Sequence, residues 1–409
     1  MLTLPDTDTL RPQTLNGVYA FPSANTELVK LDLLFEAGSA YQTKKLCASA
    51  VAKLFSTATH DMDASALAEF MDYRGILVES DCQVQQASST FYFLRRYADE
   101  LIPVVAGMLR GMAFSDADFT TWKKQRRQEI MSAMQKPADM ARRAFYSALF
   151  GDGHPLGRYA VPEDLDALTA DDVHRFFDCR YQPELLTVVA AGAVDEALVN
   201  IIKSNIPCTA KHIDRQPLAA PTAKQHCVLH TPMDDTTQTS IRIGRVLPLR
   251  WDDPDYAHLM LLITALGGYF GSRLMCNLRE DKGYTYGIYA RSQIYRGVTV
   301  FYVTADVAAG SATAAIDEVK YELRRLIDSP IADEELELVK TVFTGDFLRS
   351  VDGIFERSAR FCDMYATDVD ERITENLRTA LASTTPQRLQ QLALRYLSPD
   401  DMTVCTAGA

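Results

Sequence analysis

Apolar and polar positions follow two different periods along this chain. Alternation with a period of two predicts strands, for example over residues 28–35 and 299–304, whereas apolar residues that recur every three or four positions predict amphipathic helices over residues 116–135 and 332–347. Strands with hairpin-like neighbours and long helices on one face are typical of α+β sandwiches. We therefore predict an α+β protein whose sheets are mostly antiparallel and carry their helices on one face.

One segment of the sequence occurs twice. Residues 168–193 (LTADDVHRFFDCRYQPELLTVVAAGA) resemble residues 384–409 (TTPQRLQQLALRYLSPDDMTVCTAGA), and the two ends lie 409 − 193 = 216 residues apart. Each copy begins with threonine as a helix N-cap, continues at helical spacing to Arg-Tyr, turns at proline, and closes with a small-residue run that reads as a strand buried on one face. Chance similarity is the alternative, but the order, the turn and the terminal Ala-Gly-Ala all coincide, which favours a duplicated unit.

The length agrees with two such units. A chain of 409 residues fits two domains of roughly 200 residues each. Between the repeats, residues 206–225 contain several prolines, which interrupt regular elements. We therefore predict an N-terminal α+β domain over residues 1–205, a linker over 206–225 and a homologous C-terminal α+β domain over 226–409.

The composition is typical of a globular protein that needs no lipid bilayer. Hydrophobic residues make up 47% and charged residues 23% of the chain. The formal charge of −12, from 54 acidic and 42 basic residues without a long basic tract, argues against nucleic acid as a partner and favours basic over acidic peptides. Residues 1–16 lack a basic start followed by an apolar run, so we expect a cytoplasmic protein, or a periplasmic one if an export signal has been removed.

The cysteines and histidines form no recognisable metal motif. The eight cysteines are scattered without a C-x-x-C pair, which argues against a zinc ribbon or a disulfide framework, so we expect mostly buried, reduced thiols. His226 and His230 have the i, i+4 spacing of helical ligands, but CVLHTPM looks extended, which would place their side chains about 13 Å apart. None of the seven histidines belongs to an H-x-x-E-H or H-E-x-x-H sequence.

Three longer segments stand out by their motifs. They are AGSAYQTKK at residues 37–45, HPLGRYAVPEDLDALTADDVHRFF at 154–177 and LGGYFGSRLMCNLREDKGYTYG at 266–287. In this order they resemble the insulinase/pitrilysin family of zinc metallopeptidases, and the resemblance covers nearly the whole chain. It implies two homologous α+β domains that enclose a chamber, usually completed by a partner chain when each chain is this short.

The family's zinc-binding motif is missing here. In the family, H-x-x-E-H on a helix supplies two zinc ligands and a general base, and a further Glu about seventy residues on completes the site. The segment LCASAVAKLFSTAT places Ala48, Ser49, Ala50, Val51 and Ala52 at this motif. Alanine and valine offer no lone pairs to zinc and no base to water, so we expect no metal in this chain and no cleavage by the isolated chain.

One acidic residue matches the position of the family's last zinc ligand. In KKQRRQEIMSAM, Glu129 falls about where that Glu stands, but without the two histidines it cannot hold the ion. The resemblance therefore makes Glu129 a vestigial ligand. The alternative, which we favour, is a carboxylate on the helix surface or a partner for Arg126.

The second half keeps two residues of the family's chamber. In LREDKGYTYG, Arg279 and Tyr286 match the family's Arg and Tyr that reach across the chamber to the zinc site of the other domain. A guanidinium with several donors and a phenol with one directed donor can hold a scissile carbonyl or its oxyanion. Gly283 is expected to end the helix in a left-handed cap between them. A structural hydrogen bond between Arg279 and Tyr286 is the alternative reading.

These features favour one function and leave one alternative. We expect the non-zinc subunit of a heteromeric zinc-dependent peptidase, in which a zinc-binding homologous partner supplies the metal and this chain positions the peptide substrate through its Arg/Tyr pair. A substrate of about ten to thirty residues would lie along a sheet edge at Val78, Glu79, Ser80 and Asp81. The alternative is a catalytically inactive family member that serves as a scaffold or assembly subunit. In isolation the chain could form a homodimer.

Overall fold

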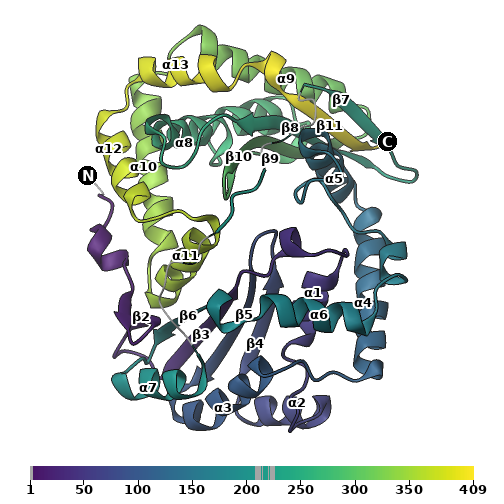
Figure 1. The fold of residues 1–409 in the computed structure, drawn as a ribbon. Coiled ribbons are helices and arrows are strands. Elements are labelled where there is room, and N and C mark those ends of the chain that lie inside the picture. Colours follow the sequence, from purple (N-terminus) through teal and green to yellow (C-terminus); the bar gives the residue numbers. More distant parts are fainter. Residues whose placement is uncertain (1–2, 208–212, 214, 220, 222–225) are drawn as a thin grey trace.

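The computed structural model describes residues 3–207, 213, 215–219, 221 and 226–409, which form two halves with a sheet in each (Figure 1). The first sheet has the strand order β1-β2-β6-β3-β5-β4, and the second has the order β7-β11-β8-β10-β9. The strands of the first sheet are β1 Gln13–Leu15, β2 Val18–Pro22, β3 Leu28–Phe35, β4 Leu77–Cys82, β5 Ala87–Leu94 and β6 Leu186–Gly192. Those of the second are β7 Val228–Pro232, β8 Gln238–Leu247, β9 Thr285–Tyr295, β10 Val298–Ala308 and β11 Thr403–Gly408.

The two sheets share one topology. If β1 is set aside, each strand of the first sheet has a counterpart at the same place in the second. β2 pairs with β6 in parallel and β7 pairs with β11 in parallel, while all other pairs are antiparallel. The predicted α+β fold of two similar, mostly antiparallel units is confirmed. The boundaries at residues 205 and 226 stay a prediction, and of the linker the described residues form neither helix nor strand.

Most helices of each half pack on one face of that half's sheet and form its main hydrophobic core. The helices of the first half are α1 Cys47–Leu54, α2 Ala64–Tyr73, α3 Ala98–Leu109, α4 Asp116–Met134, α5 Pro137–Phe150, α6 Ala170–Arg180 and α7 Glu196–Asn205. Those of the second are α8 Pro254–Gly267, α9 Ala312–Asp328, α10 Asp333–Ser350, α11 Ile354–Thr367, α12 Arg372–Ser383 and α13 Pro386–Tyr396.

The sequence repeat corresponds to the units α6–β6 and α13–β11. Thr169 caps α6 by accepting a hydrogen bond from the backbone N–H of Asp172, and Thr385 caps α13 through the N–H of Arg388. Both helices end at the predicted Arg-Tyr pair. The prediction that the following strands are buried on one face is wrong, because every residue of β6 and β11 is buried.

The second face of each sheet is covered by a helix from the other half, which explains this burial. Helix α5 packs on β8 and β11, where Phe145 and Leu149 share an apolar cluster with Cys405 of β11. Helix α11 packs on β2 and β6, where Phe361 lies against Phe21. Figure 1 shows both helices reaching across to the opposite sheet. Each half therefore needs the other to bury its sheet completely.

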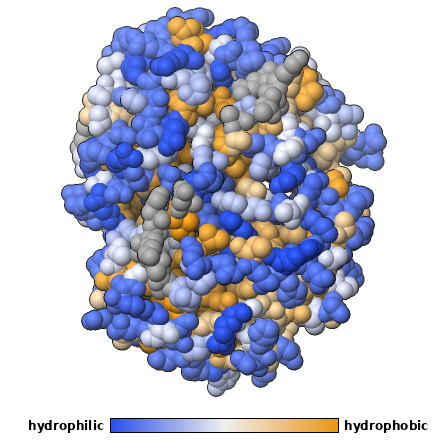
Figure 2. Space-filling model, in the orientation of Figure 1, coloured by the Kyte–Doolittle hydropathy of each residue, from blue (hydrophilic) through white to orange (hydrophobic). Residues whose placement is uncertain are grey.

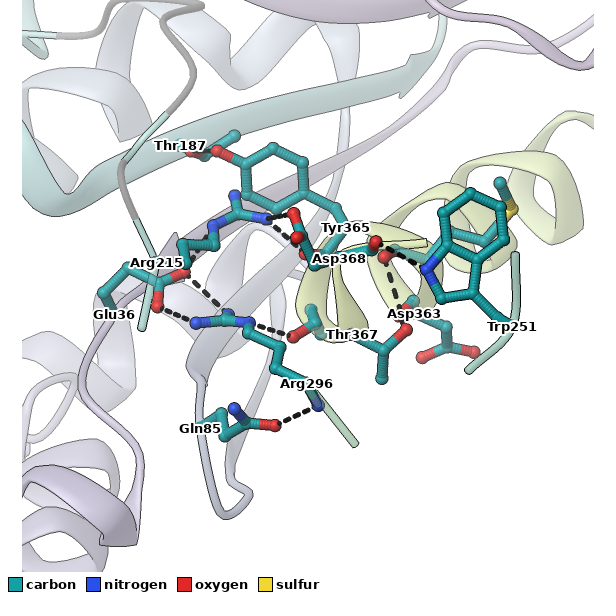
Figure 3. Close-up of polar contacts among 12 residues, drawn as sticks. Glu36, Gln85, Thr187, Arg215, Trp251, Arg296, Asp363, Tyr365, Thr367 and Asp368 are labelled. Carbon is teal, nitrogen blue, oxygen red and sulfur yellow. Dashed lines mark hydrogen bonds and ion pairs between the residues drawn. The ribbon is translucent and has the colours of Figure 1, made fainter. Parts of the chain in front are cut away.

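A buried ion-pair network also joins the halves (Figure 3). Arg296, in the turn between β9 and β10, donates through Nη1 and Nη2 to the two carboxylate oxygens of Glu36, at 2.5 and 2.9 Å. Arg215 Nε lies 3.0 Å from Glu36 Oε1, outside hydrogen-bonding geometry, and Arg215 Nη1 donates to the carbonyl of Tyr365 at 2.5 Å. The three charged side chains are only 2–3% exposed. Two guanidinium groups thus share one carboxylate where β3, the β9–β10 turn and α11 meet.

Figure 2 shows hydrophilic residues over most of the visible face, with hydrophobic residues in smaller patches. Among the described helices, none has both the length and the apolar sequence that crossing a bilayer requires. Of the described cysteines, only Cys47 and Cys405 are buried, so the expectation of mostly buried thiols is wrong. Cys208 lies outside the described residues.

Candidate functional site

Helix α1 carries the segment that stands in place of the zinc motif. Ala48, Val51 and Ala52, at the positions of the two ligands and the base, are 0%, 0% and 3% exposed and pack in the core of the first half. Ala50 is equally buried. Ser49 is half-buried, and its hydroxyl donates to the carbonyl of Leu46 at 3.1 Å. The residues present do not fit a zinc ion, since apolar side chains occupy the ligand positions.

Glu129 does not complete a metal site either. It lies on α4, its side chain is 62% exposed, and its Oε2 accepts a hydrogen bond from Arg126 Nη1 at 2.7 Å. Within the described ranges, no three His, Cys, Asp or Glu side chains come together as a group that could hold a metal ion. His226 and His230 have separate partners, since His226 Nδ1 contacts the carbonyl of Asp401 and His230 Nδ1 contacts the hydroxyl of Thr406.

The segment from Val78 to Asp81 forms most of β4, at one end of the first sheet. β4 pairs only with β5 among the described strands, so its outer edge has no strand beside it. Val78 packs toward the core of the first half, while Glu79 and Asp81 are exposed. An edge of this kind presents backbone donors and acceptors to which an extended chain can pair.

Arg279 and Tyr286 flank the cap that the sequence predicts. Arg279 lies on a π-helix over Met275–Asp281, Gly283 has the left-handed φ of +65°, and Tyr286 is the second residue of β9. The Tyr286 side chain is 89% exposed, and the guanidinium carbon of Arg279 lies 4.6 Å from the ring centroid of Phe270. Neither side chain hydrogen-bonds to the other or to another residue in the described part of the chain. Both therefore have donors available for a ligand or partner.

A pocket of about 420 Å³ lies where α1 and the end of β4 meet the second sheet. Five basic side chains line it, and we call it the basic pocket: Lys45, Arg126, Arg142, Arg158 and Arg242. Ser49 of α1 borders the same pocket, whereas Arg279 and Tyr286 do not. Along β9, Tyr286 is seven residues from Gln293, a residue of the pocket wall, which is about 23 Å at the usual strand rise.

The basic pocket was missed by sequence reasoning. Its charged residues come from the segment before α1, from α4 and α5, from the loop after α5, and from β8. No fixed spacing relates residues so far apart in the chain. Lys45, Arg126 and Arg158 lie in segments that the sequence singled out for other reasons, AGSAYQTKK, KKQRRQEIMSAM and HPLGRYAVPEDL, whereas Arg142 and Arg242 lie in none of them.

Comparisons with known proteins agree with these observations. The model of the family described as "Peptidase M16 inactive domain" matches residues 167–343. A Helicobacter pylori protein named "Non-peptidase homolog YmxG" is 23% identical over 325 residues, which is 77% of this chain and 74% of that protein. A Streptomyces coelicolor protein named "Uncharacterized zinc protease SCO5738" is 28% identical over 260 residues, 60% of this chain and 56% of that protein. The chain thus spans little more than half the length of the second relative.

Solved structures show the same fold. The M16 inactive domain from Pseudomonas fluorescens superimposes with a TM-score of 0.82 at 19% identity, covering 96% of both chains. A protease from Helicobacter pylori superimposes with a TM-score of 0.84 at 18% identity, covering 98% of this chain and 100% of the other. Taken with the three motif segments, the duplicated sheet and the apolar α1, these matches lead to one conclusion: the chain resembles the insulinase/pitrilysin (M16) peptidases, in sequence over residues 167–343 and in its fold, and it lacks their zinc motif.

Proposed function

We propose that this chain is a catalytically inactive family member that serves as a scaffold or assembly subunit for other protein chains. The observation that carries the proposal is the packing of α1. The side chains at the three motif positions are methyl or isopropyl groups held in the hydrophobic core, at 0–3% exposure. Without a metal and a carboxylate at that place, the chain has no means there to activate water. The two-sheet architecture is nevertheless complete.

The test is metal content and cleavage by the purified chain. We expect substoichiometric zinc by elemental analysis and no cleavage of a mixed peptide library. The same assays are then repeated on the complex recovered with the chain from its native cells. Stoichiometric zinc together with cleavage by the isolated chain would overturn the proposal. Absence of cleavage in every recovered complex would support the scaffold role over the second candidate below.

A second candidate role is substrate positioning for a zinc-binding homologous subunit. It is favoured by the pair Arg279 and Tyr286, because their side chains offer hydrogen-bond donors that no described residue uses. Tyr286 is also almost fully exposed. In this role the partner chain holds zinc, and the two donors orient the scissile carbonyl of a peptide that lies along β4. Arg279→Ala and Tyr286→Phe are then expected to abolish most cleavage by the complex, with the partner's zinc content unchanged.

A matched control separates this role from a general loss of structure. Tyr73→Phe removes the hydroxyl of another tyrosine that is 83% exposed, on α2 of the first half. It should leave cleavage by the complex unchanged. Full activity in both Arg279→Ala and Tyr286→Phe would refute substrate positioning and leave the scaffold role. Sedimentation of the isolated chain, with and without the candidate partner, distinguishes a heterodimer from a homodimer.

A further inference from the structure

The basic pocket is unusual because an acidic chain concentrates positive charge there. The chain as a whole carries 54 acidic and 42 basic residues, yet no Asp or Glu is among the described residues that line the pocket. All five basic side chains are half-buried. Partial burial lowers the effective dielectric constant around these charges and strengthens their attraction for an anion.

Part of this positive charge has no counter-charge. Lys45, Arg126 and Arg142 each pair with a carboxylate outside the pocket lining, at 3.2, 2.7 and 2.9 Å. Among the described residues, the guanidinium of Arg158 donates only to the carbonyl of Ser39, at 3.2 Å. The guanidinium of Arg242 forms neither a hydrogen bond nor an ion pair with the rest of the described chain, and its central carbon lies 4.5 Å from the ring centroid of Tyr302. Arg158 and Arg242 therefore offer free guanidinium donors to a ligand.

Tyrosine side chains add hydrogen-bond donors to the same wall. Tyr146, Tyr159, Tyr295 and Tyr302 all line the pocket. Burial raises the pKa of Tyr159 to about 12, although the positive charges of Arg142 and Arg242 act in the opposite direction. The phenol therefore stays protonated at neutral pH and can donate to an anion. Guanidinium and phenol donors around one cavity are suited to a carboxylate, which accepts several hydrogen bonds at once.

The place of the pocket favours a peptide over a free anion. Cys82, the last residue of β4, and Val84 just beyond it both line the pocket. A peptide that pairs with the unpaired edge of β4 would therefore continue into the pocket at that end of the strand. Nucleic acid fits less well, since the charges surround a cavity of about 420 Å³ and form no extended track for successive phosphates.

From these features we propose that the basic pocket binds an acidic side chain of an extended peptide that lies along the edge of β4, with Arg242 and Arg158 as its main ligands. The net charge of the whole chain would favour basic peptides, so this preference is local to the pocket. The proposal concerns binding by the isolated chain and holds whether or not a zinc-binding partner exists.

The test is binding of a fluorescent peptide of alternating Glu and Ser by the full-length chain, measured by fluorescence anisotropy. The same peptide with Gln in place of Glu should bind at least about tenfold more weakly, which is about 1.4 kcal/mol. Arg242→Gln and Arg158→Gln should each weaken binding of the Glu peptide by about tenfold or more. Arg349→Gln removes the same charge from an exposed site on α10, and should change binding by less than about twofold, because solvent ions screen it.

Further measurements keep the result unambiguous. Thermal melting shows whether each variant is folded; if Arg242→Gln is not, Arg158→Gln and the competition experiments decide. Amide hydrogen exchange should show added protection over residues 77–82 when the Glu peptide binds. Citrate and inorganic phosphate should displace the peptide only at much higher concentrations than unlabelled peptide does.

Several results would overturn the proposal. They are equal binding of the Glu and Gln peptides, unchanged binding in both folded pocket variants, or no added protection of β4. Displacement by citrate or phosphate at the concentration of unlabelled peptide would make the pocket a site for small anions instead. Tighter binding of oligothymidylate, sensitive to Arg242→Gln, would replace the acidic peptide by nucleic acid.

Discussion

The substitution Glu36→Gln tests whether the buried ion pairs hold the two halves together. Glutamine keeps the shape of the side chain and one acceptor oxygen but removes the negative charge. Arg296 and Arg215, at 2% and 3% exposure, would then be buried without the carboxylate they share. The carbonyl acceptors at Ala366 and Tyr365 remain, at 2.7 and 2.5 Å, and Asp368 remains as a negative charge 3.9 Å from Arg215 Nη1.

The expected loss of stability is large. Removal of one partner from a buried ion pair costs about 3–5 kcal/mol, since the remaining charge is left desolvated and uncompensated. We expect Glu36→Gln to lower the free energy of unfolding by this amount, measured by urea unfolding followed with far-UV circular dichroism. The double substitution Glu36→Gln with Arg296→Gln should lower the free energy of unfolding by less than the sum of the two single substitutions. The second substitution removes the guanidinium charge that the first leaves buried without its carboxylate.

An exposed pair provides the control. Asp346 and Arg349 on α10 form an ion pair at 2.6 Å, with side chains 53% and 79% exposed. Asp346→Asn should change stability by less than about 1 kcal/mol, as is usual for surface pairs. If Glu36→Gln changes stability no more than Asp346→Asn does, the charge of Glu36 is not what stabilises the joint, and the reasoning is refuted.

Three further outcomes follow from local geometry. Gly283→Ala should lower the free energy of unfolding by about 1–2 kcal/mol, because the φ of +65° at this position is unfavourable for alanine. Gly345→Ala in α10 should raise it by about 0.5–1 kcal/mol, because alanine favours the helix over glycine. Neither added methyl group meets another atom, so chemical denaturation of the two variants measures the backbone effect alone. Hydrogen bonds from Lys44 and Thr169 lower the pKa of Asp172 in the folded protein. The charged carboxylate therefore stabilises the fold above its unfolded pKa near 4, and this stabilisation is lost as the pH falls below that value. Asp172→Asn should reduce stability at neutral pH and should make the melting temperature less dependent on pH in the acid range. Tyr286→Phe should leave the melting temperature unchanged, since the side chain is 89% exposed, and a clear decrease would show that Tyr286 has a structural role.

The sequence predicted those parts of the fold that depend on local rules. Capping threonines and helical spacing located α6 and α13, alternation located β3 to the residue, and Gly283 marked the left-handed cap before β9. These features succeed because each is set by neighbours within a few residues. The family resemblance added the pairing of the two halves.

Features that depend on contacts across the molecule were not predicted. The strand after α6 was expected to have one open face, but α11, which starts more than 150 residues later, covers it. Arg158 and Arg242 meet in one pocket although 84 residues separate them in the sequence (242 − 158 = 84), and neither belongs to a charge run. Likewise Glu36 gave no signal of its burial, since its partners Arg215 and Arg296 come from distant segments.

The reciprocal covering of the sheets by α5 and α11 has a consequence for synthesis on the ribosome. The strands of the first sheet are complete once residue 192 has emerged, but the apolar surface formed by Phe21, Leu34 and Val189 stays uncovered until α11, ending at Thr367, follows. In the same way, the apolar face of α5 stays uncovered until β8 and finally β11, at residues 403–408, have been synthesised. We therefore expect the nascent N-terminal half to expose an apolar surface during most of the elongation of the second half, which favours aggregation at this stage.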